Sequence, residues 1–237
     1  LFNPNNNDAV GFPALDYMLY GIGNNDTEIL DTYNNQDYGQ NHKNYVSSLI
    51  DQMKSITEIV LNDWTTAYRD EFIASTENSA SSAVNKFVND FIYYFEKGLR
   101  ANKIGIPAGN FSSTPLPHTV EGYYVRETSK DFTLEALNAF QNLFNGTHYN
   151  TNDSGVGFKD YLNYLDRNDL VNLINNQLDE ARAKISILDD NYFDQINNDN
   201  TKMTQAYDAL QTVVVLIKVD MLQAFNISVD YVDADGD

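Results

Sequence analysis

The chain has 237 residues, no cysteine and a formal net charge of −19 at pH 7. This charge repels phosphate backbones and anionic lipids, which argues against general nucleic-acid binding and against docking on acidic membranes. The lack of cysteine excludes disulfide scaffolds, zinc ribbons and cysteine nucleophiles. Hydrophobic residues make up 42% of the chain, which is too rich for a disordered acidic protein and sufficient for a packed core.

The first half of the chain predicts three helices. Pro13 suits the first turn of a short helix and Gly21 its end. Residues 22–41 are rich in Asn and Asp and are expected to be mostly loop. Residues 42–74 and 81–102 then carry apolar side chains at steps of three and four, which predicts two long amphipathic helices.

The second half begins with an irregular stretch at residues 104–131, which holds three of the five prolines. Helical periodicity returns in four segments, with a polar loop at 147–157 and an acidic loop at 189–200 between them; the segments are residues 134–144, 158–165, 169–188 and 201–225. Residues 227–232 alternate like a short strand. The most apolar run, residues 212–222, is interrupted by Lys218 and Asp220 and is too short to span a membrane. The sum predicts an all-α, helical-bundle protein.

Most sequence motifs of known chemistry are missing. There is no H-E-x-x-H, no P-loop, no dinucleotide-binding glycine fingerprint and no G-x-S-x-G. The three histidines are isolated, which favours solvated or structural roles, with entry of one into a site as the alternative. The C-terminal aspartates resemble the start of a calcium loop, but no Glu closes it, so an exposed acidic tail is expected over a cation site; they are Asp230, Asp233, Asp235 and Asp237.

Three charged residues suggest a polar site. Glu96 and Arg100 are spaced i,i+4 and can pair on one helix face just before the irregular stretch. Glu121 lies inside that stretch in a partly apolar setting. Surface pairing and a solvated loop are one interpretation, and a shared polar pocket is the other.

Several segments, in this order, resemble the imelysin family, the insulin-cleaving-membrane-protease-like proteins. They are residues 11–21 (GFPALDYMLYG), residues 96–109 (EKGLRANKIGIPAG), Glu121 with Ser129, residues 138–146, residues 155–162 (GVGFKDYL), and Val219-Asp220 with the ending VDYVDADGD. The resemblance implies two bundle-like helical domains, which we expect at residues 1–104 and 105–237, with a site near their junction. It also implies that the amino-terminal part of the first bundle lies upstream of this chain.

The family's proposed metal motif, G-x-H-x-x-E, is altered here. Gly11 matches, but Pro13 stands in the histidine position and Asp16 in the glutamate position. Proline offers no metal ligand, so the family's metallopeptidase assignment does not carry over to Pro13. The sequence therefore predicts no catalytic residue and no standard zinc-hydrolase ligand set.

The resulting expectation is a non-catalytic, imelysin-like binding protein. Its ligand would be a divalent metal or iron, or a small polar molecule, held at the domain junction; the expected ligand-binding residues are Gly11, Pro13, Asp16, Tyr17, Glu96, Arg100, Glu121 and Ser129, with Asp16 and Glu121 as metal ligands. The alternatives are a metallopeptidase with a non-standard ligand set and a protein-interaction module with an envelope partner. The resemblance implies export to the periplasm or outer membrane of bacteria, a part in iron uptake, and membrane contact only through an upstream lipid anchor.

Overall fold

In a computed structural model, the described residues are 9–151 and 153–231. They are almost entirely helical, and the described part of the chain contains no strand beyond an isolated bridge between Thr147 and Ser154. The all-α prediction is confirmed. None of the helices in these ranges is both long enough and apolar enough to cross a bilayer.

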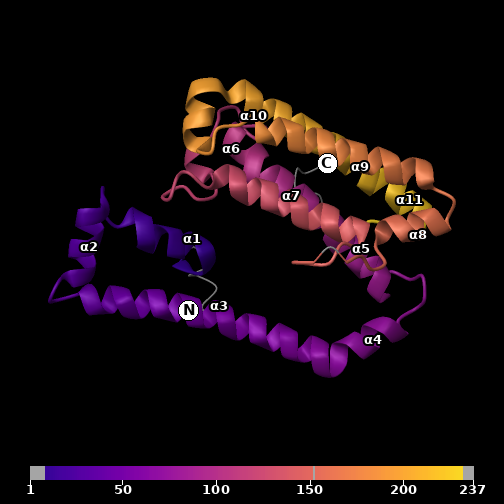
Figure 1. Ribbon diagram of the computed structural model, residues 1–237, viewed down its shortest axis with the longest axis horizontal. Coiled ribbons are helices and arrows are strands. Elements are labelled where there is room, and N and C mark those ends of the chain that lie inside the picture. The colour runs from indigo at the N-terminus through magenta and orange to yellow at the C-terminus, as the bar shows by residue number, and fades with distance from the viewer. Residues whose placement is uncertain (1–8, 152, 232–237) are drawn as a thin grey trace. The chain divides into compact units, whose positions relative to one another are not determined.

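The chain forms two compact units (Figure 1). Unit 1 comprises residues 1–74 and 121–126, and unit 2 comprises residues 75–120 and 127–237. This division differs from the expected boundary between residues 104 and 105. The two helical elements that begin at Ala83 belong to unit 2, since they pack their apolar face against its later helices. Val88, Ile92 and Leu99 on this face are fully buried.

Unit 1 is a set of helices with a small core. Its elements are α1 (Gly11–Asp16), η2 (Tyr17–Gly21), α2 (Asp26–Asn34), α3 (Gly39–Asp63), η3 (Trp64–Tyr68) and α4 (Arg69–Ala74). The core joins α1 and η2 to α3 through Ala14, Met18 and Leu49. The short and long helices predicted for this region are confirmed.

One helix of unit 1, α2, occupies residues that were predicted to be loop. Asn25 caps it by accepting a hydrogen bond from the Glu28 backbone N–H at 3.1 Å. The Glu28 carboxylate accepts bonds in return from the backbone and side chain of Asn24. The Asn-rich composition that suggested a loop therefore supplies a helix cap.

Unit 2 is a four-helix bundle with short accessory helices. Its elements are α5 (Ala83–Tyr93), η4 (Tyr94–Gly105), α6 (Ile106–Ala108), η5 (Pro117–Thr119), α7 (Ser129–Asn145), α8 (Phe158–Tyr164), α9 (Asn168–Ser186), α10 (Tyr192–Val215), η6 (Leu216–Met221) and α11 (Leu222–Phe225). The long helices form a closed bundle, because α10 packs on both α9 and η4, and α7 packs on the same two elements. Gly146 ends α7 with a positive φ of 69°.

Two expectations for unit 2 are wrong. Helix α10 begins inside the predicted acidic loop, because Asn191 caps it by accepting from the Asp194 N–H. A kink at Asp199, with a φ of −152°, separates this early part from the residues that were predicted to be helical. The described part of the predicted strand, residues 227–231, forms neither a helix nor a strand, so its alternation has another cause. Asp233, Asp235 and Asp237, named above as a possible cation site, lie outside the described residues.

Candidate functional site

The altered motif segment of unit 1 holds a loop of the same unit. The Asp16 carboxylate accepts two backbone hydrogen bonds, from Tyr124 N–H and Val125 N–H, each at 3.0 Å. The Tyr17 ring meets the Tyr124 ring edge-on, with centroids 5.1 Å apart. Both carboxylate oxygens of Asp16 are therefore used to fix residues 121–126.

The remaining motif residues supply little chemistry. Gly11 opens α1 with a φ of 71°, and Pro13 is exposed in the first turn, where its missing N–H costs nothing. Glu121 is exposed at the start of the loop. Over residues 9–151 and 153–231, no three His, Cys, Asp or Glu side chains are grouped so that they could hold a metal ion.

Glu96 and Arg100 form a buried ion pair in unit 2. Both lie on η4, and the distance between Arg100 Nη2 and Glu96 Oε1 is 3.4 Å. Their relative exposures are 1% and 0%, which makes Arg100 the largest fully buried side chain described. The helical spacing predicted the pair; of the two interpretations, surface pairing is wrong for these residues because the pair is enclosed.

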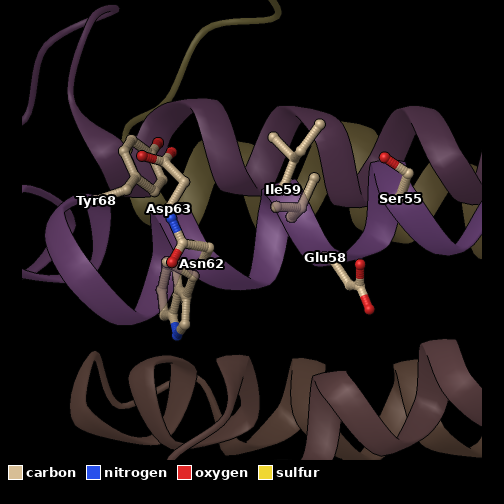
Figure 2. A pocket seen from close by; sticks show the side chains of 8 residues that line it. Ser55, Glu58, Ile59, Asn62, Asp63 and Tyr68 are labelled. Carbon is tan, nitrogen blue, oxygen red and sulfur yellow. The ribbon is translucent and has the colours of Figure 1, made fainter.

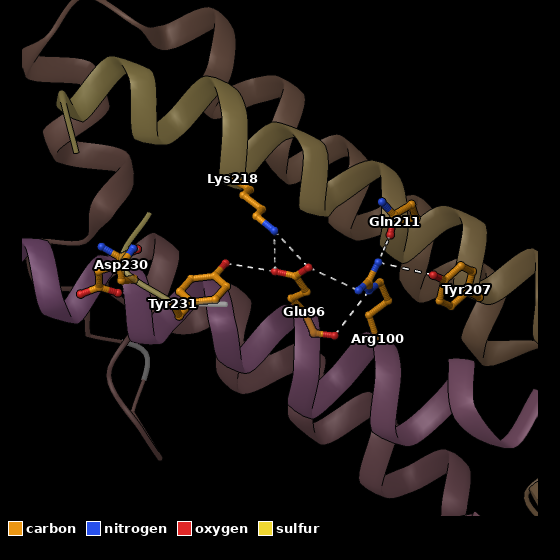
Figure 3. A network of polar contacts seen from close by, with 8 residues as sticks. Glu96, Arg100, Tyr207, Gln211, Lys218, Asp230 and Tyr231 are labelled. Atoms are coloured by element: carbon orange, nitrogen blue, oxygen red, sulfur yellow. Dashed lines mark hydrogen bonds and ion pairs between the residues drawn. The ribbon is translucent and has the colours of Figure 1, made fainter. Parts of the chain in front are cut away.

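A lysine from a distant helix completes the charged set. Lys218, on η6, places its Nζ 3.2 Å from both Oε1 and Oε2 of Glu96. The Tyr231 hydroxyl donates to Glu96 Oε2 at 3.0 Å. Figure 3 shows the Glu96 carboxylate lying between Lys218, Arg100 and Tyr231.

The guanidinium of Arg100 is held on its other side by α10. Its Nη1 donates to Gln211 Oε1, and lies 3.4 Å from the Tyr207 hydroxyl. The guanidinium carbon also lies 5.5 Å from the Tyr207 ring centroid and 5.6 Å from that of Phe111, at cation–π range. Hereafter the charged cluster means Glu96, Arg100, Tyr207, Gln211, Lys218 and Tyr231.

The expected site residues thus fall into separate groups. Asp16 and Tyr17 meet the loop that contains Glu121, all in unit 1, whereas Glu96 and Arg100 pair inside the bundle of unit 2. Ser129 is buried at the start of α7, where its carbonyl accepts from Thr133 Oγ1 at 2.9 Å.

Sequence reasoning missed four members of the charged cluster, namely Tyr207, Gln211, Lys218 and Tyr231. One signal was present: Lys218 interrupts the most apolar run of the chain, and a lysine amid apolar helix residues needs a buried partner. The partner Glu96 is more than a hundred residues away in the sequence, so helical spacing could not identify it.

The chain shares its sequence pattern with one protein family. The family model described as "Peptidase_M75: Imelysin" matches residues 1–217, which is most of the chain. No curated protein matches the chain significantly. The match includes the altered motif at Gly11, Pro13 and Asp16 as well as the charged cluster up to Gln211. The chain belongs to the imelysin family.

Proposed function

We propose that this imelysin-family protein is a non-catalytic binding protein of the bacterial cell envelope. Its ligand is a small polar molecule, and the charged side chains of the cluster in unit 2, Glu96, Arg100 and Lys218, supply the binding groups. The family resemblance supports an envelope location and a part in iron uptake.

The burial of three charged side chains inside one helical bundle carries this proposal. Glu96 and Arg100 are enclosed, and the Lys218 side chain is only 18% exposed. Taking each ion out of water costs several kcal/mol, and apolar residues of similar volume often give equal or greater stability. Stability alone does not account for such a cluster, whereas recognition of a polar ligand requires charged groups fixed in advance.

Two features support a non-catalytic role. Pro13 removes the motif histidine, and the carboxylate of Asp16 is committed to two backbone N–H groups. A metal centre at Asp16 and Glu121 would use the carboxylate lone pairs that those bonds leave free, together with further ligands. The metal version of the proposal and the metallopeptidase alternative both depend on further ligands, because the described residues group no three His, Cys, Asp or Glu side chains for a metal ion.

Isothermal titration calorimetry tests the proposal. We expect glycine or lactate, which each pair a carboxylate with a donor group, to bind the wild-type chain. Glu96→Gln, which removes the charge and keeps the shape, should weaken that binding by roughly tenfold or more. Glu180→Gln is the matched control, because Glu180 forms an exposed pair with Lys184 in the same unit.

Metal titrations and a cleavage assay test the two alternatives. Binding of iron(II), calcium or zinc that disappears in the double variant Asp16→Asn, Glu121→Gln would favour a metal protein. Cleavage of unfolded casein that a chelator stops would favour the metallopeptidase. No heat with any organic or metal titrant would contradict the binding proposal.

An exposed apolar surface on unit 1 favours a second candidate, a protein-interaction module. Beyond the part of α3 that packs on Met18, several large apolar side chains are more than 40% exposed: Ile56, Ile59, Val60, Leu61, Tyr68 and Ile73. Figure 2 shows the pocket on α3 and η3, with Ile59 between Ser55 and Tyr68. Exposed apolar patches of this kind mark interaction sites.

Dye binding tests this second candidate. We expect the wild-type chain to enhance the fluorescence of 1-anilinonaphthalene-8-sulfonate, because the dye binds exposed apolar surface. The variant Ile59→Ser, Val60→Ser should lose most of that enhancement, while Glu58→Gln on the same helix should not. Equal fluorescence from all three proteins would contradict an apolar interaction surface here.

A further inference from the structure

The charged cluster is covered on one side by the chain's own C-terminal segment. Residues 227–231, here called the strap, follow α11 without forming a helix or strand. The strap ends with Tyr231, whose hydroxyl reaches Glu96 and whose ring centroid lies 5.5 Å from Lys218 Nζ. Figure 3 shows Tyr231 entering the cluster from the side opposite Tyr207.

The two ends of the cluster differ in their access to solvent. Arg100 is completely enclosed, with α10 and Phe111 around its guanidinium. Lys218 and Tyr231 retain partial exposure. A ligand from solvent therefore meets the Lys218 and Tyr231 end of the cluster first, where the Tyr231 hydroxyl already donates to Glu96 Oε2.

Side chains of the bundle hold the strap in place. Ile227 is buried and anchors its beginning. Beyond it, one side chain of α5 clamps the backbone: Asn89 Nδ2 donates to Ser228 O at 3.1 Å, and Asn89 Oδ1 accepts from Asp230 N–H at 3.2 Å. The Tyr231 ring also meets the Tyr93 ring of α5 edge-on, with centroids 5.1 Å apart. The strap lies outside any helix or strand, and segments of this kind open locally at lower cost than buried helices.

We infer that the strap is an internal substitute for the ligand, and that the true ligand is a small hydroxy- or amino-carboxylate. This inference rests on the proposed function. Tyr231 gives a hydrogen-bond donor to Glu96 Oε2, so whatever replaces it must bring a donor, such as a hydroxyl or an ammonium group. The neighbouring Lys218 ammonium calls for a carboxylate on the same molecule.

Releasing the clamp tests the inference in two ways. Asn89→Ala removes both bonds to the strap, and Tyr231→Phe removes only the donated hydroxyl and leaves the ring. Mass spectrometry would follow acetylation of Lys218, with the exposed Lys54 as internal reference. We expect Lys218 to react roughly tenfold faster in Asn89→Ala, because two hydrogen bonds closing the strap are lost. Circular dichroism would confirm that each variant is folded.

Calorimetry on the same proteins tests the ligand class. Glycine and lactate should bind Asn89→Ala and Tyr231→Phe more tightly than the wild-type chain. A closed strap lowers the fraction of protein molecules that can bind the ligand, and both variants favour the open strap. Acetate, which lacks the donor group, should bind all three weakly.

The outcomes separate the inference from the function on which it rests. The strap would not be a substitute for the ligand if Lys218 reacted at the wild-type rate in folded Asn89→Ala. The same conclusion would follow if both variants bound glycine and lactate with wild-type affinity, and ligand binding itself would stand. Faster Lys218 reactivity with no binding of glycine or lactate to any form would overturn the ligand class and the proposed function together.

Discussion

Replacing Glu96 with alanine is expected to lower the free energy of unfolding by about 3–5 kcal/mol. The carboxylate touches Arg100 and Lys218, both charged and largely enclosed. Its removal leaves two cations in the bundle without their shared anion, and the desolvation cost of each is no longer offset. Urea denaturation followed by circular dichroism measures the loss.

Two comparison proteins give this result its meaning. Glu180→Ala removes an exposed carboxylate from an ion pair of the same unit and should cost less than about 1 kcal/mol. The triple variant Glu96→Leu, Arg100→Met, Lys218→Met removes all three charges and should be close to the wild type in stability. It should also lose glycine and lactate binding. A Glu96→Ala chain as stable as Glu180→Ala would contradict the buried cluster itself.

Periodicity predicted most of the helices because the bundle buries one face of each rod. The apolar positions at residues 84–99 predict a single helix, and the structure continues from α5 into η4 with Ile92 and Leu99 fully buried. The polar loop predicted from residue 147 follows directly on Gly146, which ends α7 with a positive φ that glycine adopts readily.

The errors arise where local hydrogen bonds outweigh composition. Asn24 and Asn25 cap α2 in a segment whose composition suggested a loop. Residues 227–231 alternate as a strand does, but the described residues offer no sheet to join. Ile227 is instead buried as an anchor, and Tyr231 reaches Glu96.

Only the local part of the candidate site could be predicted. The pair Glu96–Arg100 follows from helical spacing, because residues four apart share a face. Lys218 and Tyr231 reach Glu96 through the packing of the bundle, which spacing does not encode. Asp16 was foreseen as a site residue, while its bonds to a loop more than a hundred residues later were not.

Replacing Phe140 with alanine is expected to cost about 3–5 kcal/mol of unfolding free energy. Phe140, on α7, is 2% exposed and stacks on Phe91 with ring centroids 3.9 Å apart. Its centroid also lies 4.4 Å from that of Phe95. Truncation leaves a cavity between α7 and the helices α5 and η4. Urea denaturation measures the resulting loss of stability. Phe132→Ala, on the same helix but 44% exposed, is the matched control and should cost less than about 1 kcal/mol.

The comparison of Phe140 with Glu96 separates stability from recognition. On η4, Phe95 faces Phe140 of α7, whereas the next residue, Glu96, faces Lys218 of η6. A cavity on the α7 side should therefore leave the affinity for glycine and lactate within about twofold of the wild type, provided that the protein is folded. Glu96→Gln should lose affinity while Phe140→Ala loses only stability. Equal loss of affinity in both would mean that binding depends on the bundle as a whole and not on the charged cluster.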